Sequence, residues 1–300
     1  GPDTKVIDAG GRLVLPGGND AHIHAAHTGF TMSPGFLDFN GPSFNSLKTI
    51  QDAVAAAAAA VGPGEWVFGC GYVDANIREL AAEGRPLTRR ELDAVAPNVP
   101  VVLTDFSLHT LVANSKALEV AGFDRNYPEI PHSIGTIERD ADGELTGRFI
   151  EWGAQNLLLE KCPILSDKEL EDCILRAQAA LNREGITSHA DILGEGGEHL
   201  FRGTWGTRVI ELYEKLAEEG RLTARVSVDV FSAILGQASY DAIIRGTDRV
   251  RLPEFKDRNW VKADAIKFFV DLGGPTWQRP GIRPEGSFAS SWDGTEEEQI

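Results

Sequence analysis

Two histidines near the start of the chain have the spacing of a metal-binding pair. His22 and His24 are separated only by Ile23, and they follow a Pro-Gly-Gly turn at 16–18. Residues two apart on a β-strand project from the same face, so both imidazoles can approach one cation. Neutral imidazole is a common ligand for zinc and related metals. The pair therefore predicts part of a metal site, with Asp20 as a candidate partner for a ring N–H group.

A lysine stands within an apolar run further along the chain. Lys267 lies in the middle of residues 265–270, whose other members are all apolar. One interpretation is an edge strand from which the ammonium group faces water, because lysine is rarely buried unless it is paired. The other is a desolvated lysine that becomes carboxylated and bridges two cations through its new oxygens. The pattern alone leaves both interpretations open.

Four further side chains are candidates for a pocket. His109 directly follows a predicted strand, where barrel enzymes place working residues, although a hydrogen-bonded loop histidine fits the same pattern. Glu151 stands among apolar neighbours, either as a perturbed carboxylate or as the first residue of a helix. His189 and Asp191 share one face of a predicted strand, so they could bind metal or pair with each other.

The apolar pattern predicts an α/β protein. Capping boxes at Thr88 and Ser166 mark helix starts. Strands and helices alternate from 167 to 231, which predicts a parallel sheet with helical crossovers, either an open doubly wound sheet or a closed barrel. Residues 122–148 are rich in glycine, proline and aspartate and predict turns or a small β-meander. Helices are expected at about 46–61, 167–184 and 207–219, and strands at 4–8, 12–15, 66–70, 99–104, 186–190, 225–231 and 265–270.

Composition narrows the classes of partner. The net charge of −16 disfavours nucleic acid and anionic membranes, which need a basic surface. No stretch approaches the roughly eighteen consecutive apolar residues of a membrane-spanning helix. The three cysteines form no Cys-x-x-Cys pair, which favours a reduced, cytoplasmic compartment. The chain opens on Gly1 and closes on an acidic run like a first helical turn, so we expect a fragment cut at both ends, which leaves secretion open.

Several motifs together resemble one known family. Residues 6–17 (VIDAGGRLVLPG) run into Asp20-Ala21-His22-Ile23-His24, and this entry is similar to that of the amidohydrolase superfamily barrel. Within that superfamily the chain resembles the amidohydrolase-3 group, which includes N-substituted formamide deformylase-like enzymes. Matching segments continue along nearly the whole chain, at 92–101, 109, 114–122, 135–147, 185–188 and 266–271.

The resemblance implies a fold and a set of site residues. Residues 1–15 would end a small β-sandwich domain, and residues 16–300 would form an incomplete (β/α)8 TIM-type barrel with an inserted α+β subdomain at about 65–150. His22, His24 and a carboxylated Lys267 would bind one or two divalent metal ions, with zinc expected. His109 would contact substrate, and Asp271 would lie near the pocket. Two further histidines and a catalytic aspartate would lie beyond residue 300.

The resulting hypothesis is a metal-dependent hydrolase that cleaves a C–N amide-type bond of a small-molecule substrate with metal-activated water. The fragment alone would be inactive, because the later ligands are missing. One alternative is a non-catalytic or regulatory barrel protein of the same family. Another is a mononuclear deaminase or lyase on the same fold. The substrate and the oligomeric state stay open, with a homodimer as one candidate.

Overall fold

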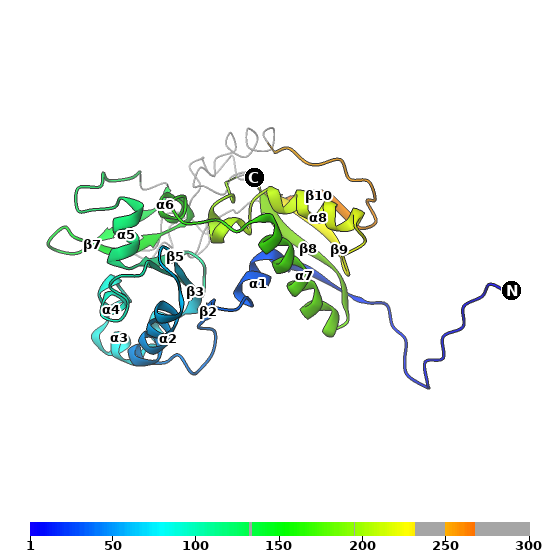
Figure 1. The fold of residues 1–300 in the computed structure, drawn as a ribbon, viewed down its shortest axis with the longest axis horizontal. Coiled ribbons are helices and arrows are strands. Elements are labelled where there is room, and N and C mark those ends of the chain that lie inside the picture. The colour runs from blue at the N-terminus through cyan, green and yellow to red at the C-terminus, as the bar shows by residue number, and fades with distance from the viewer. Residues whose placement is uncertain (132–133, 195, 232–249, 268–300) are drawn as a thin grey trace, which may run out of the picture.

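The computed structural model describes residues 1–131, 134–194, 196–231 and 250–267, and these form two β-sheets flanked by helices (Figure 1). The predicted α/β class is confirmed. The strands are β1 (Gly18–Ile23), β2 (Leu37–Asp38), β3 (Val67–Tyr72), β4 (Val101–Asp105), β5 (Thr110–Ala113), β6 (Thr136–Arg139), β7 (Leu145–Ile150), β8 (Ile186–Gly194), β9 (Arg225–Phe231) and β10 (Val261–Lys267). The helices are α1 (Ala25–Thr31), α2 (Leu47–Ala60), α3 (Arg78–Glu83), α4 (Arg89–Asp93), α5 (Ser115–Ala121), α6 (Trp152–Leu159), α7 (Asp167–Arg183) and α8 (Arg208–Glu218), with short 3₁₀ turns η1 (Asp74–Asn76) and η3 (Leu200–Gly203).

One sheet is parallel and has the strand order β1-β8-β9-β10. Helix α7 leads into β8, and α8 leads into β9, so the predicted alternation with parallel pairing is confirmed. The two helices pack against each other beside the sheet (Figure 1). Because all four strands are parallel, the carboxyl ends of β1 and β10, the first and last strands of this order, lie at the same end of the sheet.

The second sheet is mixed and has the order β2-β3-β4-β5-β7-β6. Strands β2, β3 and β4 are parallel, whereas β5, β7 and β6 pair antiparallel. Within the segment predicted to hold turns or a small β-meander, β6 and the start of β7 form an antiparallel hairpin, and β7 rather than β6 pairs with β5, so the strands are not in meander order. All six strands come from the segment between β1 and β8, and the first of them, β2, begins at Leu37, before the predicted insertion start at about residue 65.

Local capping explains where the main helices begin. Ser46 and Ser166 each accept a hydrogen bond at their side chain from a backbone N–H of the first turn. The capping boxes predicted at Thr88 and Ser166 are both present, with Glu91 and Glu169 completing them. Such reciprocal bonds satisfy backbone donors that a helix start would otherwise leave unpaired.

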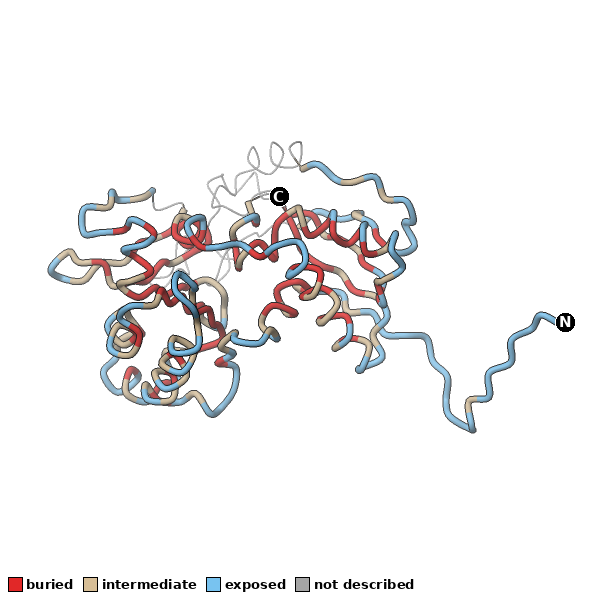
Figure 2. The backbone as a smooth tube through the Cα atoms, viewed as in Figure 1, coloured by how far each residue is buried: buried red, intermediate tan, exposed pale blue. Residues whose placement is uncertain are grey.

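Two hydrophobic cores hold the sheets and helices together. Successive residues of β4 alternate between them, because Val101 and Leu103 belong to one core and Val102 to the other. The larger core joins the two sheets, since it contains Phe149 of β7 together with Val228 of β9. Figure 2 shows the buried segments inside both halves of the molecule. No helix in the described ranges is long and apolar enough to cross a membrane.

The first seventeen residues correct a prediction. They contain neither of the strands expected at 4–8 and 12–15, and they extend away from the rest of the chain (Figures 1 and 2). The apolar alternation is real, but a strand also needs a neighbour for its backbone hydrogen bonds, and the described residues offer none here. Val6, Ile7 and Leu13 are consequently exposed.

Candidate metal and catalytic site

The His22–His24 pair lies at the carboxyl end of β1. His22 is exposed, His24 is half-buried, and their ring centroids are 5.6 Å apart in an edge-on arrangement. Helix α1 begins at the next residue, Ala25, so the strand's end and the helix start together set the direction of the His24 ring. Asp20 accepts a hydrogen bond from the backbone N–H of His22 (3.0 Å), so the structure gives it a role in the turn of the backbone and shows no bond to either ring.

His24 has the protonation state that a metal ligand needs. Its ring stacks on the indole of Trp205 with centroids 4.1 Å apart. Burial, aided by the charges of His22 and Lys267, lowers the pKa of His24 to about 4, more than a backbone contact with Ile192 raises it. The ring is therefore neutral at pH 7. Its Nδ1 atom is buried and makes no hydrogen bond within the described part of the chain.

Lys267 belongs to the same neighbourhood. It is the last residue of β10, it is half-buried, and it pairs in register with Phe231 of β9. The preceding side chain, Ile266, is 51% exposed. The positive charge of Lys267 is the smallest of the causes that lower the pKa of His24.

His109 is held by Glu151. The Nδ1 atom of the imidazole lies 2.9 Å from the Oε2 atom of the carboxylate. Glu151 immediately precedes α6, as the helix-start interpretation predicts, yet its side chain makes no capping bond. Its backbone is left-handed (φ 70°), a conformation that few non-glycine residues adopt. The carboxylate is therefore aimed at His109, while its second oxygen, Oε1, is buried without a hydrogen bond among the described residues.

Two tryptophans connect His109 to His24. The His109 ring stacks on Trp152 at 4.9 Å, and Trp152 meets Trp205 edge-on at 5.3 Å. Trp205 in turn stacks on His24, so an unbroken row of aromatic rings joins the two sheets. Sequence reasoning missed Trp205, which stands in a loop with no periodic pattern. The sequence feature that could have identified Trp205 is a large aromatic residue between two glycines, at 203 and 206.

His189 and Asp191 have separate partners. His189 is buried beside Gln178, with 3.3 Å between the His Nε2 and Gln Nε2 atoms, and burial lowers its pKa to about 4. Asp191 accepts hydrogen bonds from the Tyr213 hydroxyl (2.6 Å) and from the backbone N–H of Ala25 (3.2 Å). Burial raises the pKa of Asp191 to about 7. Asp191 therefore anchors the start of α1, directly after His24.

The described residues supply only part of a metal-binding group. Within them, no three histidine, cysteine or acidic side chains gather closely enough to hold an ion. The two imidazoles of β1 nevertheless have suitable donor chemistry, since they lie side by side, and one is neutral with an unpartnered buried nitrogen. Asp271 lies outside the described residues.

Comparison with known proteins places this geometry in context. Residues 5–298 match the model of the amidohydrolase family. The chain is 29% identical over 279 residues to N-substituted formamide deformylase of Arthrobacter pascens, an alignment covering 92% of this chain and 47% of the deformylase. It is 28% identical over 278 residues to the YtcJ protein of Bacillus subtilis (strain 168), covering 92% of this chain and 47% of that protein. The chain thus spans about half the length of these curated relatives.

A solved structure shows the same fold at low sequence identity. The crystal structure of an uncharacterized metal-dependent hydrolase from Pyrococcus horikoshii OT3 superimposes with a TM-score of 0.52 at 20% identity. The superposition covers 86% of this chain and 43% of that one. At this identity the likeness concerns the arrangement of helices and strands alone.

Proposed function

The chain belongs to the amidohydrolase family, and from that premise we propose that it forms part of a metal-dependent hydrolase acting on a C–N amide-type bond of a small molecule. The parallel sheet β1-β8-β9-β10 would be the first part of a (β/α)8 barrel, and the mixed sheet would be a subdomain inserted between β1 and β8. The observation that carries the proposal is the half-buried His24 beside His22 at the carboxyl end of β1, with its Nδ1 atom buried and making no hydrogen bond among the described residues.

In this proposal His22, His24 and Lys267 hold the metal, with zinc as the expected ion. A divalent cation supplies Lewis acidity toward water and toward the amide carbonyl. Lys267 would serve as a ligand in its carboxylated form, because an unmodified ammonium group repels a cation. The low pKa of His24 keeps its ring ready to bind at neutral pH without first losing a proton.

His109 would accept a proton from the substrate or donate one to it. With Nδ1–H donating a hydrogen bond to the Glu151 carboxylate, the Nε2 atom of the neutral ring is left as a base, and in the imidazolium form it is a donor to the carbonyl oxygen. Trp152 stacks on the same ring and restricts its rotation. Glu151 therefore sets the tautomer, and Trp152 sets the plane of the ring.

The decisive experiment measures metal and activity together in the full-length protein. We expect stoichiometric zinc or a similar metal by elemental analysis and hydrolysis of an N-alkylformamide. His22→Ala and Lys267→Ala should each lose most of the metal and the activity, whereas His199→Ala, which changes a histidine assigned to neither site, should retain both. A properly folded but metal-free protein would overturn the proposal. Bound metal without hydrolysis of any amide would favour the non-catalytic alternative.

The number of metal ions bound per chain distinguishes the lysine-bridged hydrolase from a mononuclear deaminase or lyase. A carboxylated Lys267 adds the mass of one CO2, about 44 Da, which intact-protein mass spectrometry under native conditions detects. Two ions per chain with this adduct support a lysine bridge. One metal ion per chain together with an unmodified Lys267 would instead support the mononuclear deaminase or lyase.

A further inference from the structure

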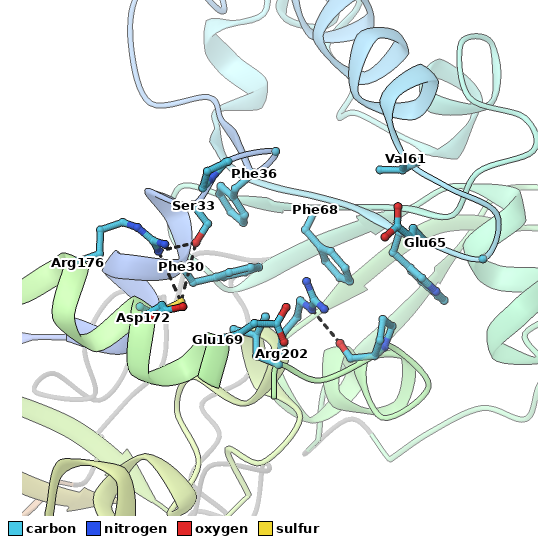
Figure 3. A pocket seen from close by; sticks show the side chains of 17 residues that line it. Phe30, Ser33, Phe36, Val61, Glu65, Phe68, Glu169, Asp172, Arg176 and Arg202 are labelled. Atoms are coloured by element: carbon cyan, nitrogen blue, oxygen red, sulfur yellow. Dashed lines mark hydrogen bonds between the residues drawn. The ribbon is translucent and has the colours of Figure 1, made fainter. Parts of the chain in front are cut away.

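A cavity lies away from the proposed metal site. It has a volume of about 510 Å³ and is enclosed by the end of α1, the following loop, β3, α7 and η3 (Figure 3). None of His22, His24, Lys267, His109 or Glu151 lines it. Its lining includes four aromatic side chains, Phe30, Phe36, Trp66 and Phe68, together with charged groups. This volume suits a small molecule with an apolar body.

Arg202 is one of the two arginines that line this cavity. Its guanidinium carbon lies 4.9 Å from the centroid of Phe68 and 5.7 Å from that of Phe30. The Nε atom donates to the carbonyl oxygen of Pro163 (2.9 Å). The two terminal nitrogens have no hydrogen bond or ion pair with the described residues. The other lining arginine, Arg176, uses one terminal nitrogen, Nη1, to donate to the Gly29 carbonyl and the Ser33 hydroxyl, and it likewise has no ion pair with the described residues.

The backbone is bent to deliver Arg202 to the cavity. Phe201 and Arg202 are consecutive left-handed residues, with φ values of 48° and 62°, although neither is glycine. Such conformations persist where the surrounding structure demands them, and they cluster at ligand sites. The bend directs Phe201 toward His27, at 4.6 Å between ring centroids, and Arg202 into the cavity.

The neighbouring carboxylates limit what can bind. Asp172 pairs with Lys168, Glu169 caps α7 through Ser166, and Glu65 accepts from the backbone N–H of Gly62. Each of these three groups has a partner of its own and none forms an ion pair with Arg202, although the charge of Glu169 acts on the guanidinium. Their negative charge nevertheless repels a phosphate or another polyanion. A single carboxylate is the anion that one arginine fork accommodates in such surroundings.

We propose that this cavity binds a small arylcarboxylate, whose carboxylate accepts hydrogen bonds from the terminal nitrogens of Arg202 and whose ring lies against Phe36, Trp66 and Phe68. Recognition requires both parts of the ligand. The guanidinium, already flanked by two aromatic rings, holds the anion in fork geometry, and the aromatic walls remove the apolar ring from water.

The test compares matched probes by calorimetric titration of the full-length protein. Phenylacetate should bind, whereas neutral phenylacetamide, ring-free acetate and dianionic phenyl phosphate should bind at least tenfold more weakly. Arg202→Gln should weaken phenylacetate binding by about tenfold or more, as expected for the loss of a charge-assisted pair. The matched control Arg183→Gln, at an exposed position of α7, should leave binding unchanged.

A second variant tests the charge without removing the arginine. Glu169→Gln keeps the capping box but removes a negative charge near Arg202, so it should tighten phenylacetate binding severalfold. His22→Ala should bind phenylacetate as the native protein does, which distinguishes this cavity from the proposed metal site. Equal binding of phenylacetate and phenylacetamide, an unaffected Arg202→Gln variant, weaker binding by Glu169→Gln or loss of binding in His22→Ala would each overturn the proposal.

Discussion

His109 and Glu151 are joined twice, once through their side chains and once through their backbones. The imidazole Nδ1 lies 2.9 Å from the carboxylate Oε2, and the backbone N–H of Glu151 donates to the carbonyl oxygen of His109 (2.8 Å). The backbone bond extends the pairing of β5 with β7, since Thr110 and Ile150 are partners in that ladder. The pairing of β5 with β7 therefore fixes the positions of the His109 and Glu151 side chains relative to each other.

The first prediction concerns this pair. Glu151→Gln retains the shape of the side chain but no longer favours the tautomer with the proton on Nδ1. We expect kcat for amide hydrolysis to fall by roughly 10- to 100-fold, as for other partners that orient a working histidine, with a smaller change in KM. The pH profile of kcat should also shift, because the charge beside the imidazole is lost. Steady-state kinetics across pH measures both.

Glu184→Gln is the matched control for this substitution. Glu184 is exposed at the end of α7, and the same change of charge there should leave kcat and its pH profile as they are. An unchanged kcat in Glu151→Gln would show that the bond to His109 has no part in the reaction.

The second prediction concerns Asp191 and pH. Burial raises the pKa of this carboxyl to about 7, whereas in an unfolded chain it titrates near about 3.9. The folded state therefore holds a proton that the unfolded state releases, so this group's contribution to stability is full below pH ~4 and is lost as the pH rises to about 7. The loss is at most about 4 kcal/mol.

Asp191→Asn removes that titration. The difference in unfolding free energy between variant and native protein, measured in urea at pH 5 and pH 8, should shift in favour of the variant at the higher pH. A difference that is the same at both pH values would contradict the raised pKa. The buried histidines make the folded state less stable as the pH falls, which is the opposite trend. Because they are present in both proteins, their effect cancels when the two unfolding free energies are subtracted.

The third prediction concerns His27, which is buried against Phe201. Burial, with the nearby charge of His24, lowers the pKa of His27 to about 3. The unfolded chain binds a proton near pH ~6.5, so stability is lost as the pH falls from there toward 3. His27→Phe keeps an aromatic ring, and its unfolding free energy should fall less steeply between pH 6.5 and 4. Parallel loss in both proteins would contradict this account.

The fourth prediction concerns the contact between α1 and α7. A Cβ atom added to Gly29 would lie 1.8 Å from the carbonyl oxygen of Cys173. In an exposed helix, alanine is more favourable than glycine by about 1 kcal/mol. Here we expect the opposite sign, with Gly29→Ala destabilising the protein by roughly 1–3 kcal/mol through overpacking.

Gly18→Ala provides the comparison for thermal or urea unfolding. Its new Cβ would make only ordinary contact, 3.5 Å from the nearest side-chain atom of Ile186. The change should therefore be small. Equal effects of the two substitutions would show that α1 and α7 adjust freely.

Local patterns predicted much of this molecule. The capping boxes and the main helices follow from residue spacing, because each depends on residues close by in the sequence. The parallel pairing of β8 with β9 follows from the alternation of consecutive strands and helices. The strands expected at 4–8 and 12–15 did not form, because their stability depends on partners that spacing does not reveal. The position of His109 after a strand was visible in the sequence, whereas its contact with Glu151, 42 residues later, was only accessible once the strands had paired.

The row of aromatic rings shows a different limit. Trp152 and Trp205 come from a helix start and an irregular loop, and only the packing of the two sheets brings them to 5.3 Å. The left-handed backbone of Phe201 and Arg202 has no marker either, since such positions usually carry glycine or asparagine. The placement of Arg202 in the cavity was therefore inaccessible to sequence reasoning.

Because His24 stacks on Trp205, the fluorescence of this tryptophan should depend on the state of the candidate metal site. An indole 4.1 Å from a candidate ligand senses a change in that ligand's charge through its emission. The chain has six tryptophans, so the contribution of this one is the spectrum lost in Trp205→Phe. Metal loading of the native protein can then be followed continuously, in real time and without an added dye.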